Sequence, residues 1–206
     1  IGTDGAASYD YPKVDLEFLR DTGVRIRVRV RGVEVTCAVR VTDRFGHVPL
    51  YMLEPVHPDH RWITRRLYEA GTDIRVAQEM LLGIGGVRAL NWLGLDVATY
   101  HFNEGHAAFA GIELIAERME GGMTFPEAWA ETRSKIVFTT HTPVPAGHDF
   151  FEPAHALHYL RPLQQRLRLS DEELLALGRV DPDNAAEEFC MTVLALKLSR
   201  RASAVS

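Results

Sequence analysis

Hydrophobic and charged residues alternate strictly over residues 24–30, where valine and isoleucine are separated by arginine. A period of two is typical of a β-strand with one face in solvent. Arg31-Gly32 follows as a turn, and the apolar run over 33–41 predicts a second strand that forms a hairpin with the first. A third strand is predicted over 48–53. The arginine row could form an anion site, but its period favours the ordinary solvated face of a sheet.

The period changes to that of a helix over residues 74–93. Apolar residues recur there at 76, 77, 80, 81, 84, 87 and 90, which share one helical face. The segment contains Gly83-Ile84-Gly85-Gly86, but no strand precedes it, and Arg88 stands where a dinucleotide-binding loop has its last glycine. Because glycine in a helix costs roughly 1 kcal/mol relative to alanine, we expect these glycines to allow close packing against a neighbouring backbone.

The remaining sequence alternates between short β-rich runs and helical periods. In order, it predicts a buried strand over 97–102, helices over 107–120 and 125–134, a strand over 136–140, and helices over 154–166, 171–178 and 186–202. Thr124 and Glu127 form a capping box at the start of one helix. A strand, a helical crossover and a strand in one sheet almost always form a right-handed parallel unit. The pattern therefore predicts an α/β fold in which both strands end at the same edge.

Two histidine-bearing loops follow these two strands. The first reads His101-Phe102-Asn103-Glu104-Gly105-His106, and the second runs from His141-Thr142 to Gly147-His148-Asp149. Ligands bind at the carboxyl ends of parallel strands, and loops that are polar but poor in lysine and arginine suit a neutral, hydroxyl-rich ligand such as a sugar. We expect side chains of both loops to line one cleft: His101, Asn103, Glu104, His106, His141 and Thr142.

Each loop also has a purely structural interpretation. Asn103 can donate and accept hydrogen bonds and Glu104 can accept them from sugar hydroxyls, but either residue could instead cap the helix that follows. Pro143 and Pro145 hold the residues before them extended, so the peptide after His141 should have a fixed direction. A fixed carbonyl aimed at a ligand can stabilise a transition state, although the prolines could simply make a rigid turn. We interpret His148 as a loop residue without a ligand.

Composition and charge exclude several classes of protein. A length of 206 residues with 46% hydrophobic content suits one core, and a net charge of −5 argues against a nucleic-acid partner. No apolar run is long enough to span a membrane, and no signal peptide is recognisable. Cys37 and Cys190 predict no disulfide framework. Together, these three observations indicate a cytoplasmic protein. The histidine spacing is not that of a zinc helix, and no nucleophile elbow is present, so we expect no metal and no hydrolase triad.

Four segments, in this order, resemble the α-glucan phosphorylases (glycogen, starch and maltodextrin phosphorylases) of the shorter bacterial and archaeal type. They are residues 77–90 (AQEMLLGIGGVRAL), 103–109 (NEGHAAF), 137–149 (VFTTHTPVPAGHD) and 191–202 (MTVLALKLSRRA). Residues 1–60 match only loosely. The chain opens at Ile1 and stops where a new strand is predicted to begin, so we expect a fragment of the family's N-terminal domain: a β-rich part over 1–60 and a Rossmann-like part over 61–206.

The resemblance implies the Rossmann-like N-terminal half of a GT-B glycosyltransferase fold, with a β-hairpin or meander at its start. It implies phosphorolysis of α-1,4-glucans by inorganic phosphate to glucose 1-phosphate with retention, and a homodimer. His141 would be catalytic, through its main-chain carbonyl, and the residues that bind substrate would be Asn103, Glu104, His106 and Thr142. Pyridoxal phosphate would be bound by a C-terminal domain that supplies its lysine, so we expect the chain alone to be inactive.

Two alternatives to a phosphorylase remain from the sequence. The chain could belong to a glycogen or starch synthase, a transferase of the same architecture that uses a nucleotide sugar. It could also be a noncatalytic relative that binds glucan. The chain departs from the resembled pattern at Cys190, where relatives carry asparagine.

Overall fold

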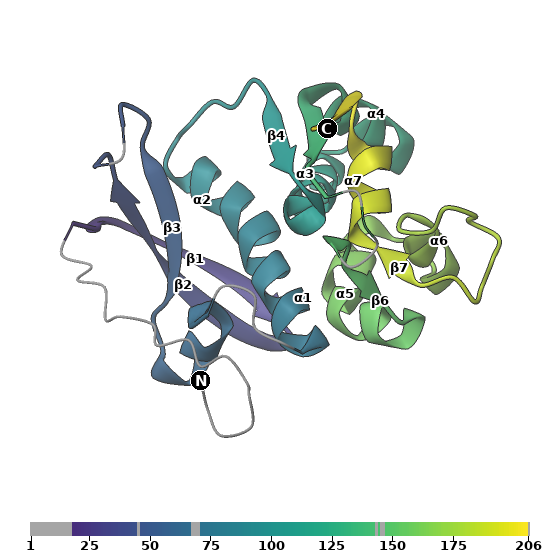
Figure 1. Ribbon diagram of the computed structural model, residues 1–206, viewed down its shortest axis with the longest axis horizontal. Coiled ribbons are helices and arrows are strands. Elements are labelled where there is room, and N and C mark those ends of the chain that lie inside the picture. The colour runs from purple at the N-terminus through teal and green to yellow at the C-terminus, as the bar shows by residue number, and fades with distance from the viewer. Residues whose placement is uncertain (1–17, 45, 67–70, 143, 145–146, 206) are drawn as a thin grey trace.

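The computed structural model describes residues 18–44, 46–66, 71–142, 144 and 147–205, and every structural statement below refers to these residues (Figure 1). The first half contains β1 (Arg20–Val30), β2 (Val33–Thr42), β3 (Leu50–Pro55), the 3-10 helix η1 (Pro58–Thr64), α1 (Thr72–Met80), the π-helical turn η2 (Leu81–Gly85) and α2 (Gly86–Trp92). The second contains β4 (Tyr100–Asn103), η3 (Gly105–Ala107), α3 (Phe109–Glu120), α4 (Phe125–Lys135), β5 (Ile136–Thr140), β6 (Phe150–Phe151), α5 (Pro153–Leu167), α6 (Asp171–Ala176), β7 (Phe189–Cys190), α7 (Met191–Leu198) and β8 (Arg201–Ala204).

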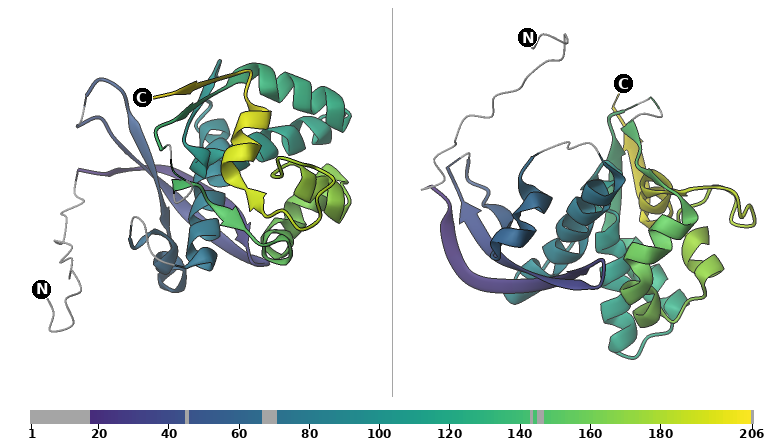
Figure 2. Two further views of the ribbon diagram at one scale, coloured as in Figure 1. Left: turned by 45° about the vertical axis from the view of Figure 1, so that its right-hand side comes forward. Right: turned by 90° about the horizontal axis from the view of Figure 1, so that it is seen from below.

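The predicted hairpin is confirmed. β1 and β2 are antiparallel, with Val30 opposite Val33 around a turn in which Arg31 and Gly32 have φ of 51° and 76°. β3 pairs antiparallel with β2 and begins at Leu50, two residues later than predicted. The arginines of β1 are exposed while the apolar residues between them are buried, as the solvated-face interpretation requires. The sheet curves around α1 and α2 (Figure 2).

The glycine-rich segment lies where two layers approach each other closely. It forms η2, in the middle of one long helix that continues from α1 into α2. A Cβ on Gly83 would lie 2.6 Å from the backbone nitrogen of Ala110 in α3, and a Cβ on Gly85 would lie 2.8 Å from Leu53 of β3. The close packing expected against a neighbouring backbone is therefore confirmed for Gly83, whereas Gly85 packs against side chains of the sheet and an added Cβ on Gly86 would meet nothing within 4 Å.

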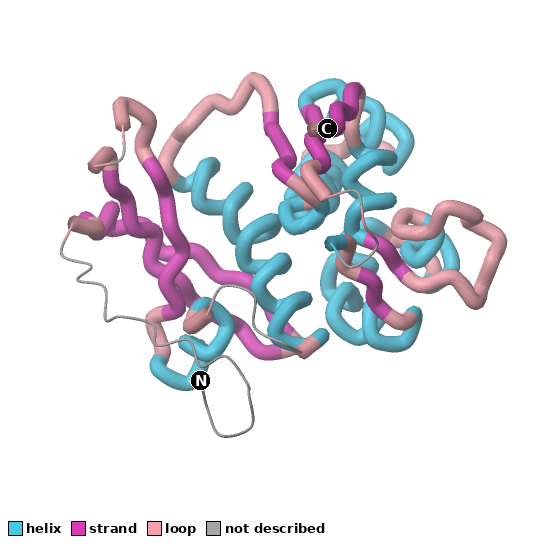
Figure 3. Tube along the Cα trace, viewed as in Figure 1, coloured by secondary structure: helices cyan, strands magenta, loops and turns pink. Residues whose placement is uncertain are grey.

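A second, parallel sheet carries the two loops. Its strand order is β4-β5-β8, with Asn103 opposite Thr139 and Phe138 opposite Ala202. Figure 3 shows the two groups of larger strands on either side of the α1–η2–α2 helix. The parallel pairing of β4 with β5 is confirmed, but the strand predicted over 97–102 is shorter and less buried. It begins at Tyr100 and buries only Phe102, because among the described strands it has β5 alone as a neighbour.

The single helix predicted over residues 186–202 is wrong. The segment forms β7, which pairs antiparallel with β6, then α7, and then β8. The helix ends because Ser199 is extended, with φ −98° and ψ 139°, and the Arg200 amide donates to the Ile136 carbonyl at 3.0 Å. Pairing with β5 satisfies the backbone of β8 as well as a further helical turn would, and this tertiary contact cannot be inferred from local propensity.

One core connects the two halves. Its buried residues include Val28 of β1, Ile84 of η2, Phe109 of α3 and Leu194 of α7. The two cysteines are buried free thiols, and the capping box at Thr124 and Glu127 is present. Within the described ranges, no helix combines the length and the hydropathy needed to cross a bilayer.

Candidate functional site

A cleft of about 700 Å³ opens at the carboxyl ends of β4 and β5. Five of the six residues expected in the cleft line it, together with Arg75 and Asp149: Asn103, Glu104, His106, His141 and Thr142. The two loops meet directly, since the main-chain amide of His141 donates to the carboxylate of Glu104. The structure thus brings together residues that lie almost 40 positions apart in the sequence because the strands before them are parallel neighbours.

His101, which was expected in the cleft, does not line it. Its Nε2 lies 2.8 Å from the hydroxyl of Thr139, on the exposed surface of the sheet. The prediction failed because His101 lies within β4, two residues before the strand ends. His148 does not line the cleft either, and its Nδ1 lies 2.9 Å from the hydroxyl of Thr192.

Glu104 holds the second loop rather than capping a helix. Its carboxylate accepts hydrogen bonds from the main-chain amide of His141, from the Thr140 hydroxyl at 3.1 Å and from the Thr142 hydroxyl at 3.5 Å. The side chain makes no capping bond to η3. Burial raises the pKa of Glu104, but the bonds from His141 and Thr140 outweigh it, and the pKa is lowered overall. The carboxylate oxygens of Glu104 therefore already accept hydrogen bonds from the end of β5 and from the second loop.

The backbone of Glu104 is unusual as well. Its φ is 66° and its ψ is −179°, a combination that glycine adopts readily and other residues rarely do. Neighbouring Asn103 is exposed, and its side-chain amide has no hydrogen-bond partner among the described residues. The capping alternative therefore fails for both residues, and Asn103 lines the cleft.

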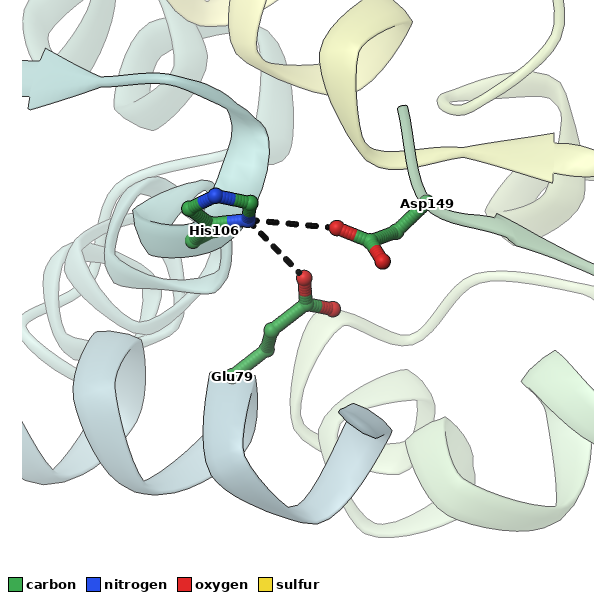
Figure 4. Close-up of side chains that lie close together, drawn as sticks. All are labelled: Glu79, His106 and Asp149. Carbon is green, nitrogen blue, oxygen red and sulfur yellow. Dashed lines mark hydrogen bonds and ion pairs between the residues drawn. The ribbon is translucent and has the colours of Figure 1, made fainter. Parts of the chain in front are cut away.

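A cluster of charged side chains lies beside these loops, formed by Arg75, Glu79, His106 and Asp149 (Figure 4 shows the last three). We call it the Asp149 cluster. Asp149 accepts two hydrogen bonds from Arg75, at 2.9 and 3.0 Å, and lies 3.1 Å from Nδ1 of His106. Glu79, whose side chain is 1% exposed, has its Oε1 3.5 Å from the same nitrogen.

The environment moves the proton affinities of the cluster in different directions. Burial raises the pKa of Glu79 to about 8. The hydrogen bond with Asp149, followed by the one with Glu79, raises the pKa of His106 to about 9. Burial opposes the ionisation of Asp149, but the bonds from His106 and Arg75 prevail and lower its pKa. At neutral pH, Asp149 is thus an anion between two cations.

Glu79, His106 and Asp149 are donor types that zinc accepts, and their ligand atoms lie within 4.8 Å of one another. Arg75 already provides a positive charge within 3.0 Å of both Asp149 oxygens, however. A metal ion would have to displace this guanidinium. The geometry therefore gives no support for a metal centre.

Arg75, Glu79 and Asp149 were not assigned to the site by sequence reasoning. Arg75 and Glu79 are four positions apart and share a helix face, which was a usable signal for an ion pair. What the sequence could not show is that this helix faces the loops, since its apolar positions indicated only a buried side. Asp149 lies in one of the four segments that resemble the α-glucan phosphorylases, but the sequence indicated no role for it.

Comparison with known proteins gives consistent relatives. No family model matches the chain. A maltodextrin phosphorylase of Thermococcus litoralis is 46% identical over 165 residues, 78% of this chain and 19% of that protein. A glycogen phosphorylase of Mycobacterium tuberculosis is 36% identical over 100% of this chain and 26% of its own length, and one of Aquifex aeolicus is 32% identical over 78% and 24%. The chain thus spans about a fifth to a quarter of these relatives.

Among solved structures, the catalytic domain of starch synthase IV from Arabidopsis thaliana, bound to ADP and acarbose, has a similar fold. It superposes with a TM-score of 0.58 at 15% identity, covering 91% of this chain and 34% of that one. At this identity the likeness shows the fold alone, and it confirms the predicted Rossmann-like architecture of a GT-B glycosyltransferase. The sequence relatives, at 32% to 46% identity, show that most of this chain is similar to a segment of the α-glucan phosphorylases.

Proposed function

We propose that this chain forms the sugar-binding side of an α-glucan phosphorylase active site, which transfers a glucosyl unit from an α-1,4-glucan to inorganic phosphate and releases glucose 1-phosphate with retained configuration. One observation carries the proposal: the five residues expected from the family resemblance line a single cleft. That cleft lies at the carboxyl ends of parallel strands, where ligands bind in open α/β sheets.

In this proposal His141 acts through its main-chain carbonyl. Glu104 holds the amide of His141 on one side of that carbonyl and the hydroxyl of Thr142 on the other. A dipole fixed in this way stabilises developing positive charge on the sugar without the cost of reorganising during the reaction. The stiffening expected of Pro143 and Pro145 lies outside the described residues. The side-chain amide of Asn103, which lines the cleft, is suited to binding a sugar hydroxyl.

Pyridoxal phosphate, the cofactor that the resemblance implies, does not fit the described part of this chain. A Schiff base requires a lysine, and neither Lys135 nor Lys197 lines the cleft. The ammonium of Lys197 instead donates to the carbonyls of Ala176 and Arg179, at 2.8 and 2.6 Å. We therefore derive no step through the cofactor and propose that residues of another domain bind it.

The first test is binding of maltoheptaose by the 206-residue chain, followed by heteronuclear NMR. We expect the backbone signals of the two loops to shift, and Asn103→Ala to weaken the binding because it removes two donors and an acceptor. Arg133→Ala, an exposed change outside the cleft, is the control. Shifts confined to other surfaces would contradict the proposal, and shifts on addition of ADP-glucose but not maltoheptaose would favour a synthase.

The second test is activity. The pure chain should release no glucose 1-phosphate from maltodextrin, because its described residues place no lysine at the cleft. A chimera in which the chain replaces the matching segment of the Thermococcus litoralis maltodextrin phosphorylase should be active. Within it, His141→Ala should reduce turnover less than Glu104→Ala, since the carbonyl survives the first change and loses its support in the second. The reverse order would assign the role to the imidazole.

A further inference from the structure

Asp149 joins three parts of the chain that are far apart in the sequence. Its carboxylate accepts two bonds from Arg75 of α1 and lies 3.1 Å from His106 of the first loop. Its main-chain carbonyl accepts from the Met191 amide at 3.0 Å, at the start of α7. The side chain of Asp149 thus contacts Arg75, which is 74 positions away in the sequence, and His106, which is 43 positions away. A single residue therefore fixes the end of the second loop to two helices and to the first loop.

We propose that Asp149, held by Arg75, is a positioning residue of this cleft, which orients the ring of His106 and keeps the end of the second loop fixed against α1. The proposal rests on the proposed function only for the identity of the cleft as a sugar site. The positioning itself follows from the contacts. Glu104 holds the second loop at its beginning and Asp149 holds it at its end, so the residues between them are supported on both sides.

The two-point bond between Arg75 and Asp149 is what makes Asp149 a suitable support. A guanidinium and a carboxylate joined by two parallel hydrogen bonds define an orientation as well as a distance. The side chains of Arg75 and Asp149 are 19% and 20% exposed, so water screens the pair only in part. Lysine at position 75 would keep the charge but not the paired geometry.

The charge of His106 depends on the groups that face it from each neighbouring element. From α1, Glu79 favours the charged ring, whereas Arg75, with Nη2 2.7 Å from Nδ1, opposes it. Glu104 of the first loop and Asp149 both favour it. The one charged residue of α7, Lys197, is engaged with two carbonyls elsewhere. Asp149 contacts both cations directly, so its removal should leave them facing each other.

The experiment is an NMR titration of the histidine imidazoles in the 206-residue chain, with the His106 signal assigned by its loss in His106→Gln. In the unmodified chain His106 should titrate near pH 9. In Asp149→Asn the midpoint should fall by about one unit or more, as expected when an opposite charge within hydrogen-bonding distance is removed. Titration of His106 at its ordinary value of 6.5 in the unmodified chain would overturn the proposal without any variant.

Asp171→Asn is the matched control. Asp171 also accepts bonds from an arginine, Arg161, and from a second side chain, Gln164, but it lies outside the cleft. The same chemical change there should leave the titration of His106 where it was. An equal effect of the two variants would show that Asp149 has only a general structural role.

Hydrogen exchange provides a second readout that does not depend on Asp149→Asn folding. Arg75→Lys should accelerate exchange of the amides of residues 147–149 several-fold more than Arg161→Lys does. Equal exchange in the two lysine variants would contradict the proposed support of the loop. Neither readout uses a glucan, so failure of maltoheptaose binding would disprove the proposed function and leave the positioning role standing. Failure of the titration and exchange predictions would disprove the positioning role and leave the proposed function standing.

Discussion

Gly83 is the position at which one added carbon atom should disturb the packing most. In Gly83→Ala, the new Cβ would lie 2.6 Å from the backbone nitrogen of Ala110 and 2.9 Å from the carbonyl carbon of Phe109. Backbone atoms cannot rotate away as the end of a side chain can, so α3 and the α1–η2–α2 helix would have to separate. Because η3 leads directly into α3, the displacement should extend to His106.

The size of the effect follows from two opposing contributions. Overpacking costs about 1–3 kcal/mol, and contact with two backbone atoms points to the upper end of that range. Alanine gains up to about 1 kcal/mol over glycine inside a helix. The net loss of unfolding free energy should be about 2 kcal/mol, which for a chain of this length lowers Tm by about 4–8 °C.

Gly86 provides the matched control within the same glycine segment. Its backbone is helical, with φ −60° and ψ −49°, and nothing lies within 4 Å of an added Cβ. Gly86→Ala should therefore gain the helix propensity without the clash and raise Tm by about 2–4 °C. Thermal unfolding followed by circular dichroism measures both variants, and urea unfolding gives the corresponding free energies.

The two variants should move Tm in opposite directions. If Gly83→Ala raised Tm as Gly86→Ala does, the segment would not need a bare backbone at position 83, and the close contact with α3 would not explain the glycine. If both variants lowered Tm equally, the cost would arise from the helix itself and not from its neighbour.

Two further predictions concern the loops. Glu104→Gln keeps the shape of the side chain but loses its charge, so hydrogen exchange of the His141 amide should become about tenfold faster, equivalent to about 1.4 kcal/mol; an unchanged rate would mean that another group holds this amide. The pKa of His106 is raised from 6.5 to about 9, so its contribution to stability is complete below pH 6.5 and is lost as the pH rises through 9. Urea unfolding should show this fall in the unmodified chain and a smaller one in His106→Gln, and equal falls would refute the assignment.

Much of the fold could be predicted from the sequence because local patterns and tertiary contacts agree there. The alternation over residues 24–30 predicts a strand with its arginines in water, and the structure contains that strand. The parallel pairing of β4 with β5 followed from chain order alone, through the handedness of strand–helix–strand units. Five cleft residues could be named in advance for the same reason.

The failures occur where a distant partner decides the local structure. Residues 201–204 form a strand because β5 is available to pair with them, although their composition also suits a helix. Glu104 lines the cleft as expected, but its bond from the His141 amide depends on a partner 37 positions away and could not be inferred from the local sequence. Arg75 and Glu79 belong to the site because α1 lies beside the loops, which no periodicity along one helix can reveal.

The backbone of Glu104 implies a conflict between stability and activity at that position. Holding a residue other than glycine at φ 66° and ψ −179° costs about 1–3 kcal/mol, so selection for heat resistance alone would favour Glu104→Gly. That replacement would relax the chain and remove the carboxylate that holds His141 and Thr142. A stability screen blind to function should therefore enrich glycine at position 104 while the second loop loses its support.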